Sequence, residues 1–334
     1  MGAKVSQKIH AGFLGTGSYL PEKILTNKEM EQIVDTTDEW IVTRTGIKER
    51  RVAAPTQTTS DMSVEAAKKA LANAGLKPTD LDLIIVATIT PDMPTPATAC
   101  LVQNKLGAPQ AAAFDISAAC SGFVYGLSIA KAFVESGTYK RILLIGAEKL
   151  TAFIDWKDRG SCVLFGDGAG AAIIGEVPEG KHEILSSYMA ANGSEADLLN
   201  IPGGGCKFPS SLQSVDQRMH FLRMAGKEIF KVAVRVMSEA IVEAVKRANI
   251  ELSQVSLVVP HQANLRIIQA IGERMGLPSE KIFVNVDKIG NTSAASVIIA
   301  LDEALQKGLI KEGQYLVFVA FGAGTTLASS VVKW

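Results

Sequence analysis

The stretch that decides the fold is Ala74-Gly-Leu-Lys-Pro-Thr-Asp-Leu-Asp-Leu-Ile-Ile85, because a copy of it lies further along the chain. It aligns without gaps with Ala248-Asn-Ile-Glu-Leu-Ser-Gln-Val-Ser-Leu-Val-Val259, at a shift of 248 − 74 = 174 residues. Each copy follows a helical pattern, at residues 63–74 and 228–248, and runs into an apolar, β-branched strand. Such internal similarity predicts that one structural unit occurs twice.

A second pair of segments repeats at a similar distance. Residues 120–137 and 291–308 each predict a helix that follows a strand and a turn and ends at a glycine, and the shift is 291 − 120 = 171 residues. Further strands are expected at residues 141–146 and 314–321, and glycine-rich turns then lead into strands at residues 169–175 and 326–332. The element order expected in each half is therefore β, α, β, α, β, β.

Strands that alternate with helices at this spacing predict an α/β fold. We expect mainly parallel sheets, right-handed crossovers, helices packed on the sheet faces and active residues at the carboxyl ends of strands. The two halves, residues 1–174 and 175–334, would pack into one five-layered body. The alternative is a pair of ordinary α/β domains whose similarity is due to chance.

The composition agrees with this fold class. The 334 residues are 47% hydrophobic and 20% charged, with 34 Lys and Arg against 34 Asp and Glu, which is typical of a globular protein with a large core. Continuous apolar runs and 29 glycines favour strands that are buried on both faces. A neutral net charge, without a cluster of basic and aromatic residues, gives no reason to expect nucleic-acid binding.

The sequence also bears on the compartment. The N-terminal segment lacks the apolar stretch of a signal peptide, and other apolar segments are interrupted before they reach membrane-spanning length. Residues 1–6 formally match a myristoylation pattern, but so short a pattern does not favour lipidation. No two of the four cysteines form a C-x-x-C pair, so neither a zinc site nor a redox pair is expected. We expect a cytoplasmic protein without a membrane partner.

Cys120 is the candidate nucleophile. In Phe114-Asp-Ile-Ser-Ala-Ala-Cys120-Ser-Gly-Phe-Val-Tyr-Gly126, a strand ends in small residues and a helix begins directly after the cysteine. A helix N-terminus favours the thiolate, so we expect a thiol pKa below the ordinary value of about 8.5 and an amide able to bind an oxyanion. A buried structural cysteine is the alternative. The other cysteines lack this context and are expected to be core or loop residues: Cys100, Cys162 and Cys206.

Two further residues follow predicted strands. His261 lies just beyond the buried strand that ends in Val-Val-Pro260, and the repeat makes it the counterpart of Ala87. A histidine that replaces alanine in one copy indicates a specialised position, although a hydrogen-bonded structural role is equally common. Asn291 is the counterpart of Cys120 at the shift of 171, where it could donate without ionising or simply cap the helix. Pseudo-symmetry should bring these helix starts toward one pocket.

Three other motifs give weaker support to other functions. A papain-like hydrolase also uses Cys, His and Asn, but its cysteine lies near the mature N-terminus in a different signature and fold. Gly15-Thr-Gly-Ser-Tyr-Leu20 lacks the third glycine of a dinucleotide fingerprint. The turns at residues 165–170 and 321–324 match each other but precede no helix, which disfavours nucleotide binding. The second turn could supply an oxyanion-binding amide, at Ala323, beside that of Cys120.

Six runs of residues, spread through almost the whole chain, resemble the β-ketoacyl-acyl carrier protein synthase III family. This family contains the initiating condensing enzymes of type II fatty acid synthesis and belongs to the thiolase-like superfamily. The runs are Asp38-Glu-Trp-Ile-Val-Thr-Arg-Thr-Gly-Ile47, Ala118-Ala-Cys-Ser-Gly-Phe123, Asp158-Arg-Gly160, Phe165-Gly-Asp-Gly-Ala-Gly-Ala171, Pro260-His-Gln-Ala-Asn-Leu-Arg-Ile-Ile268 and Gly290-Asn-Thr-Ser-Ala-Ala-Ser296.

The resemblance implies a thiolase-like fold and a ping-pong mechanism. Cys120 would take an acyl group from an acyl-CoA and release CoA, and malonyl-acyl carrier protein would then bind. His261 and Asn291 would hydrogen-bond the malonyl thioester oxygen during decarboxylation, and the resulting carbanion would attack the acyl group to give a 3-ketoacyl product. No metal or redox cofactor is implied, and a homodimer is.

The resemblance also implies binding roles. The expected CoA contacts are Thr36, Trp40, Arg44, Arg159, Phe230 and Asn264, with Trp40 and Arg159 stacking on either face of the adenine. Aromatic and guanidinium planes both stack on bases, which makes these roles chemically reasonable. Lys231 and Arg266 resemble the basic patch that docks the acidic carrier protein. Ordinary surface charges, a helix staple at Trp40 and core filling at Phe230 are the alternatives.

Two positions depart from the family pattern. Thr95 stands where enteric members have a phenylalanine that reaches across the dimer interface to close the acyl pocket, so we expect longer or branched primers to be accepted. The run Phe321-Gly-Ala-Gly324 lacks the tryptophan that often follows this turn. Two other functions remain open, namely a related synthase of secondary metabolism with a different acceptor, and a non-catalytic thiolase-like subunit.

Overall fold

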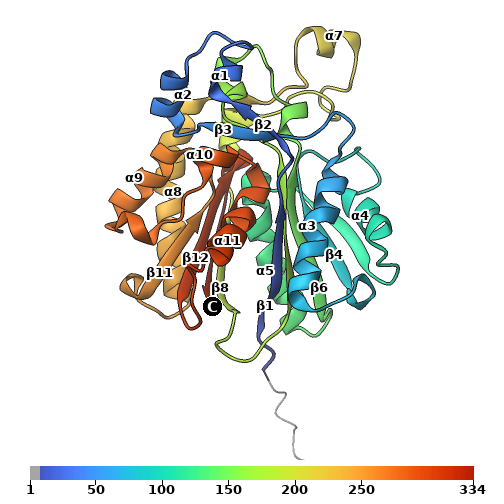
Figure 1. Ribbon diagram of the computed structural model, residues 1–334, viewed down its shortest axis with the longest axis vertical. Coiled ribbons are helices and arrows are strands. Elements are labelled where there is room, and N and C mark those ends of the chain that lie inside the picture. The colour runs from blue at the N-terminus through green and yellow to red at the C-terminus, as the bar shows by residue number, and fades with distance from the viewer. Residues whose placement is uncertain (1–7) are drawn as a thin grey trace, which may run out of the picture.

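The computed structural model describes residues 8–334 and shows five layers of helices and strands (Figure 1). The myristoylation pattern at residues 1–6 lies outside the described residues. One sheet contains β1 (Ala11–Tyr19), β4 (Leu83–Ala87), β5 (Ala112–Ile116), β6 (Arg141–Glu148) and β7 (Gly168–Glu176). The other contains β8 (Glu183–Ala190), β11 (Val255–Pro260), β12 (Tyr315–Gly322) and β13 (Thr326–Lys333). The expected α/β class is confirmed.

Helices cover both sheets and fill the space between them. Helices α3 (Thr59–Ala74) and α4 (Thr98–Leu106) pack on the outer face of the first sheet. Helices α8 (Gly226–Arg247) and α9 (Leu265–Met275) pack on the outer side of the second sheet. Helices α5 (Gly122–Glu135) and α11 (Ser296–Gln306) contact strands of both sheets and form the middle layer.

The middle layer is the apolar centre of the molecule. Phe123 and Leu127 of α5, and Ile298 and Leu301 of α11, are fully buried in one core cluster with strands of both sheets. Each such side chain contributes about 1.5–3 kcal/mol by its removal from water. Two helices packed on every side cannot shift easily, because core side chains interlock at close to crystal density. The N-terminal ends of α5 and α11 are therefore held rigidly in place.

The strands run in the order β11-β12-β13-β8-β1-β7-β6-β4-β5, and a single residue pair, Gly12 with Glu183, joins β1 to β8. Within residues 8–334, the strands that pair in parallel are β4 with β5, β4 with β6, and β11 with β12. The expectation of mainly parallel sheets was therefore wrong. Strands β12 and β13 are joined by a turn at residues 323–325 that is too short for a crossover, so the chain returns antiparallel.

The expected element order was also incomplete. Between β4 and the helix that follows Cys120, the chain inserts α4, which was not predicted, and β5, which is the strand expected before Cys120 but was missing from the expected element order. The second half matches this unit with α9 and a bridge from Val258 to Ile282. Helix α4 lacks a capping side chain at Ala97, so its start has no strong sequence signal.

Strand registers support the larger repeat. Leu83 pairs with Ile142 across β4 and β6, and Leu257 pairs with Leu316 across β11 and β12. Both residues of the second pair lie 174 positions after those of the first, so Ala87 and His261 are counterparts. The division at residues 174 and 175 remains a proposal, and β7 runs across it to Glu176.

The second repeated pair needs a correction. A 3₁₀ turn at Ala119–Ser121 opens α5, and another at Ser293–Ala295 opens α11. Their first residues share left-handed φ angles of 46° and 49°, which makes Ala294, rather than Asn291, the backbone counterpart of Cys120. The shift of 171 holds only at the glycine ends of the helices, because α5 has 14 residues and α11 has 11.

Smaller elements gather around one end of the layers (Figure 1). They are β2 (Lys23–Thr26), α1 (Asn27–Met30), α2 (Asp38–Thr45), β3 (Glu49–Val52), α6 (Arg159–Cys162), β9 (Leu199–Asn200), α7 (Leu212–Asp216), β10 (Arg223–Met224) and α10 (Val286–Ile289). They lie beyond the carboxyl ends of the parallel strands, where active residues are expected. Within residues 8–334, no helix combines the length and apolarity needed to cross a membrane.

Candidate active site

Cys120 lies where two cavities meet. An outer cavity of about 720 Å³ and an inner cavity of about 550 Å³ both have Cys120 in their walls. The residue is buried in the 3₁₀ turn before α5. Gly322 packs directly against it, because a Cβ atom on Gly322 would lie 2.7 Å from the Cys120 amide nitrogen. The turn after β12 therefore approaches the cysteine backbone as closely as glycine allows.

The expected low pKa of the Cys120 thiol was wrong. Burial raises the pKa of this thiol to about 12, and its interaction with the Ser293 side chain only partly offsets that effect. The sulfur sits in the 3₁₀ turn before α5, and loss of hydration outweighs the field of the helix N-terminus. The resting residue is therefore a thiol, and a proton acceptor is needed when it attacks.

His261 follows β11 and is almost fully buried. Its backbone N–H donates to the Val319 carbonyl at 2.8 Å, and its Nδ1 lies 2.6 Å from the Ser296 Oγ. Ser296 Oγ also accepts a weaker bond from the Gln262 N–H at 3.3 Å. Burial lowers the pKa of His261 to about 3, so the imidazole is neutral at physiological pH. A neutral ring can donate a hydrogen bond without bringing a charge into the cavity.

Asn291 is held by its own backbone. Its N–H donates to the Leu164 carbonyl at 2.8 Å, and its carbonyl accepts from the Gly166 N–H at 3.0 Å. Its side-chain Oδ1 accepts from the Ser293 N–H at 2.9 Å. Because the oxygen end of the amide is engaged, the Nδ2 group is the end that can donate into the outer cavity, whose wall includes Asn291.

Gly290 makes this placement of Asn291 possible. Its φ of 66° and ψ of −162° fall in a region that is essentially restricted to glycine. A Cβ atom there would lie 2.9 Å from the Leu164 carbonyl oxygen and 3.0 Å from the Arg50 Cβ. We expect Gly290→Ala to lower the free energy of unfolding by about 1–3 kcal/mol and to displace Asn291.

Thermal unfolding and a malonyl-thioester decarboxylation assay check this expectation. Gly276→Ala is a matched control, because Gly276 has a φ of 64° but open space around its Cβ position, far from the cavity wall. The control should lose stability without losing decarboxylation. Normal decarboxylation by Gly290→Ala would contradict the role given to this glycine.

Arg50 is a buried support that the sequence did not reveal. Its guanidinium donates to the carbonyls of Leu25 at 3.1 Å and Val163 at 2.7 Å, and to Asn27 Oδ1 at 2.9 Å. Burial lowers the pKa of Arg50 to about 10, which still leaves it charged at neutral pH. These bonds anchor the segment that pairs with Asn291. The only sequence signal was a charged residue in a short strand.

Other supporting residues were also missed. Glu148, Ser293, Ser296 and Gln262 are buried next to the candidate catalytic residues. Ser293 and Ser296 lie within the Gly290–Ser296 run, so their position was visible but their role was not. Glu148 ends the otherwise apolar strand β6, and a single carboxylate after such a run is a signal that could have been noticed.

The outer cavity gathers most of the predicted binding residues. Its wall includes Cys120, His261 and Asn291 together with Trp40, Arg44, Phe230, Lys231, Asn264 and Arg266. The Arg266 guanidinium lies 5.6 Å from the centre of the Phe230 ring. Lys231 and Arg266 are exposed, so they place positive charge where the cavity opens to solvent. Asn264 caps α9 by accepting from the Arg266 N–H at 2.8 Å.

Two predicted CoA contacts lie outside this wall. Arg159 stacks on Trp40, with its Cζ 4.8 Å from the ring centre, and donates to the Asp35 carbonyl at 2.9 Å. A base between the two planes would have to separate them, so the expected sandwich is closed in this structure. Thr36 is half-buried beside Asp35, and its Oγ1 is a buried hydroxyl without a hydrogen-bond partner. Such a hydroxyl is available to a ligand.

The inner cavity extends from Cys120 toward the loop after β4. Its wall is largely apolar and includes Ile89, Pro91, Pro94, Ile116, Ala118, Leu150, Phe165, Leu199, Ile201 and Leu222. Ala323, at the start of the turn after β12, also lines it, so this residue lies on the same cavity as Cys120. Thr95 is exposed on the loop and does not line the cavity of its own chain, so its expected role depends on a partner subunit.

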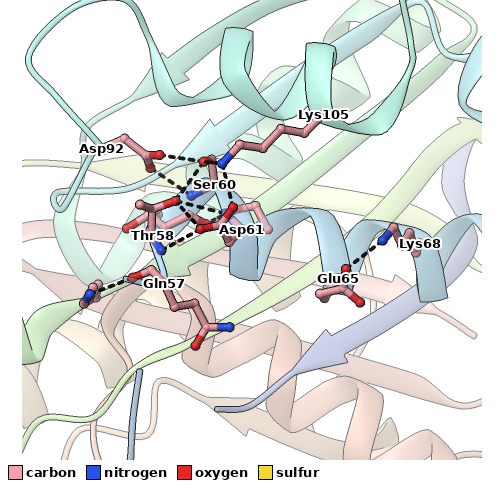
Figure 2. A network of polar contacts seen from close by, with 11 residues as sticks. Gln57, Thr58, Ser60, Asp61, Glu65, Lys68, Asp92 and Lys105 are labelled. Carbon is pink, nitrogen blue, oxygen red and sulfur yellow. Dashed lines mark hydrogen bonds and ion pairs between the residues drawn. The ribbon is translucent and has the colours of Figure 1, made fainter. Parts of the chain in front are cut away.

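A polar network ties this loop to helices α3 and α4 (Figure 2). Asp92 accepts from the Ser60 backbone N–H at 2.8 Å and from its hydroxyl at 2.5 Å, and Lys105 donates to the Ser60 Oγ at 2.7 Å. The part of the loop at Asp92 is therefore held in place. Pro91 and Pro94 in the same loop line the inner cavity, so this network positions one of its walls.

Across residues 8–334, no group of three or more His, Cys, Asp or Glu side chains is arranged to hold a metal ion. Cys162 is buried, and Cys100 and Cys206 are exposed.

Comparisons with known proteins agree with this geometry. A profile described as 3-Oxoacyl-[acyl-carrier-protein (ACP)] synthase III matches residues 114–193, and one for the C terminal part of that protein matches residues 245–334. The chain is 58% identical over 328 residues to the beta-ketoacyl-[acyl-carrier-protein] synthase III of Caldanaerobacter subterraneus subsp. tengcongensis, covering 98% of this chain and 99% of that protein.

Solved structures give the same result. The 3-oxoacyl-[acyl-carrier-protein] synthase III of Aquifex aeolicus VF5 matches with a TM-score of 0.90 and 49% identity, covering 97% of this chain and 100% of the other. The priming beta-ketosynthase of the R1128 polyketide pathway matches with a TM-score of 0.90 and 37% identity, covering 99% and 98%. The expected thiolase-like fold and the family resemblance are confirmed. The chain belongs to the 3-oxoacyl-[acyl-carrier-protein] synthase III family of condensing acyltransferases.

Proposed function

We propose that Cys120, His261 and Asn291 carry out the activity of this family in the present chain. The enzyme joins an acyl-CoA primer to malonyl-acyl carrier protein and releases CO₂ and CoA, which starts fatty acid synthesis. The observation that carries the assignment of residues is that Cys120 lies at the junction of two cavities, with His261 and Asn291 in the wall of the outer one.

In the first half-reaction, the Cys120 sulfur attacks the thioester carbonyl of the primer. The primer carbonyl oxygen becomes an oxyanion, which the amides of Cys120 and Ala323 would bind. Such preorganised donors act most strongly in a cavity that excludes water. CoA leaves through the outer cavity, and the acyl chain occupies the apolar inner cavity. The loop that carries Pro91 and Pro94 forms part of the wall of the inner cavity.

In the second half-reaction, malonyl on its carrier enters through the outer cavity. Neutral His261 and the Asn291 amide donate hydrogen bonds to the malonyl thioester oxygen, where negative charge develops as CO₂ leaves. The carbanion then attacks the acyl carbon on Cys120, and the carbon–sulfur bond breaks to free the thiolate. Neutral donors suit this step, because a positive imidazole would be expensive to bury here.

The remaining binding roles follow from the outer cavity. Trp40, Arg44 and Phe230 would contact CoA along the wall, Asn264 would donate or accept near its pantetheine arm, and Thr36 and Arg159 would meet the adenine end. Lys231 and Arg266 would attract the acidic carrier protein at the mouth. We propose further that the enzyme is a cytoplasmic homodimer that needs no metal or redox cofactor.

We expect a broad range of primers. Thr95 is smaller than the aromatic residue that closes the acyl pocket in some relatives, and the inner cavity holds about 550 Å³. Turnover with a panel from acetyl-CoA to octanoyl-CoA, including branched acyl-CoAs, should show transfer of chains longer than acetyl. Thr95→Phe should then shift the preference toward acetyl-CoA by about tenfold or more. The reason is that the phenylalanine side chain would fill the volume of several methylene groups of the primer. If the unchanged enzyme used acetyl-CoA and no longer or branched acyl-CoA, this prediction would be contradicted.

One observation favours a second candidate function. The similarity to the priming ketosynthase of the R1128 polyketide pathway covers 99% of this chain, so the same site could serve a different acceptor. The discriminating experiment is mass spectrometry after addition of acyl-CoA and then malonyl-acyl carrier protein. Formation of a 3-ketoacyl-carrier product supports the first function, while an acyl adduct without condensation favours the second.

A further inference from the structure

Glu148 is a buried carboxylate for which the steps above give no role. It ends β6, its exposed fraction is 0%, and within residues 8–334 it forms no ion pair. Its Oε2 accepts from the Thr90 hydroxyl at 2.7 Å and from the Thr88 hydroxyl at 3.2 Å. A carboxylate held by neutral donors alone is costly to keep ionised, because no cation offsets its lost hydration. Burial accordingly raises the pKa of Glu148 to about 7.

Ser293 connects this carboxylate to the nucleophile. Its hydroxyl donates to Glu148 Oε1 at 3.0 Å, and the same hydroxyl lies within hydrogen-bond reach of the Cys120 sulfur. The backbone of Ser293 has a left-handed φ of 49°, and its N–H is held by Asn291 Oδ1 at 2.9 Å. The Ser293 hydroxyl therefore interacts with both the carboxylate and the thiol.

Cys120 needs a neighbouring group that can accept its proton. Its thiol has a pKa of about 12, so few molecules carry a thiolate at neutral pH. His261 does not meet this need when the Ser296 hydroxyl donates to its Nδ1, because the ring proton then sits on Nε2. That arrangement suits a hydrogen-bond donor for the malonyl oxygen and leaves no ring lone pair to take a proton from sulfur.

We propose that Glu148 accepts the Cys120 proton through the Ser293 hydroxyl during acylation. The S–H bond breaks as the proton moves to Ser293 Oγ, and the hydroxyl proton of Ser293 moves to Glu148. The sulfur forms a bond to the thioester carbon, and the carbon–sulfur bond to CoA breaks. The CoA thiolate then takes the proton from Glu148 and leaves as a thiol, which restores the Glu148 carboxylate and keeps charge balanced. The inference rests on the proposed acyl-Cys120 thioester.

Among residues 8–334, Cys120 is an ionisable neighbour on which the charge of Glu148 acts, and this charge raises the pKa of the thiol. Lys149 turns away and donates to backbone carbonyls, among them that of Gln57 at 2.6 Å. Asp167 precedes the β7 residue that pairs with Glu148, and its carboxylate is engaged by Thr151 and by the Ala53 N–H. The turn at residues 88–90 offers hydroxyls and an amide only.

Rapid-quench mass spectrometry of acyl-enzyme formation tests the proposal between pH 5.5 and pH 9. The primer is the acyl-CoA that the unchanged enzyme transfers fastest. Its acylation rate should fall as the pH drops below about 7, because Glu148 becomes protonated and cannot accept. Glu148→Gln should acylate about a hundredfold more slowly or worse near pH 7, as is usual for loss of a base, and should lack that acidic limb.

Three further variants separate a proton route from a structural role. Ser293→Ala removes the hydroxyl but leaves Glu148 in place, and it should lose acylation to a similar extent, so the test survives if Glu148→Gln fails to fold. Thr90→Val removes a donor to the charged carboxylate, so the acidic limb should move to higher pH while the rate at pH 9 stays near normal. His220→Ala should acylate normally, because His220 lines neither cavity.

Each result is readable against the proposed function. If the unchanged enzyme forms no acyl adduct, the proposed function fails. If it does and Glu148→Gln acylates as fast with the same pH profile, the proton route is overturned. Loss of acylation in His261→Ala with a normal Glu148→Gln would overturn it as well, and would assign the proton to the histidine.

Discussion

Replacing Cys120 with alanine should abolish the acyl adduct and lower the condensation rate on the order of 10⁴-fold or more, because no other group can take the acyl chain. The sulfur is the only nucleophile placed at the junction of the two cavities in the described part of the chain. Mass spectrometry of the protein after incubation with acyl-CoA measures the adduct directly. The variant should fold, since loss of one buried sulfur atom costs about 1 kcal/mol.

A matched control is available in the same chain. Cys162 is also buried, yet it lines neither cavity, so Cys162→Ala should keep both the adduct and turnover. Cys120→Ala should still decarboxylate malonyl-acyl carrier protein, because His261 and Asn291 remain in place. An acyl adduct that persists in Cys120→Ala would refute the nucleophile, and loss of the adduct in Cys162→Ala would point to a second acylated thiol.

The sequence predicted the features that depend on local pattern. Repeated apolar strands and glycine-capped helices indicated two similar α/β halves. The 174-residue shift also paired Ala87 with His261 correctly. The resemblance then named the residues that the structure brings to one cavity wall. These predictions work because strand and helix periodicity, and the spacing of short motifs, are written in neighbouring residues.

What the sequence could not supply depends on partners far away along the chain. Glu148 and Ser293 are 145 residues apart, and Arg50 and Val163 are 113 apart, yet each pair is joined by a buried hydrogen bond. The raised pKa of the Cys120 thiol could not be predicted for the same reason, because the burial of this residue depends on both halves of the chain. The counterpart of Cys120 was misplaced by three residues, because a difference in helix length is invisible until the 3₁₀ turns are compared.

Replacing His261 with alanine should lower malonyl decarboxylation and condensation by about a hundredfold or more, because one of two donors to the developing charge is lost. Acyl-adduct formation on Cys120 should continue, which separates this variant from Cys120→Ala. His220→Ala is a control, since His220 bonds Ser214 at 2.9 Å and neither residue lines either cavity. Release of CO₂ from malonyl-acyl carrier protein and mass spectrometry of the adduct measure the two half-reactions separately.

The pH dependence of this step has a definite sign. Burial places the folded pKa of His261 at about 3, below its ordinary value of 6.5, so the neutral ring persists throughout the range from pH 5 to pH 9. Decarboxylation should therefore show no limb due to His261 in that range. Stability should be lost as the pH falls from about 6.5 toward 3, because the unfolded histidine binds a proton that the folded one excludes. His261→Ala should flatten that part of the stability profile, and a decarboxylation rate that His261→Ala leaves unchanged would exclude the ring as a donor.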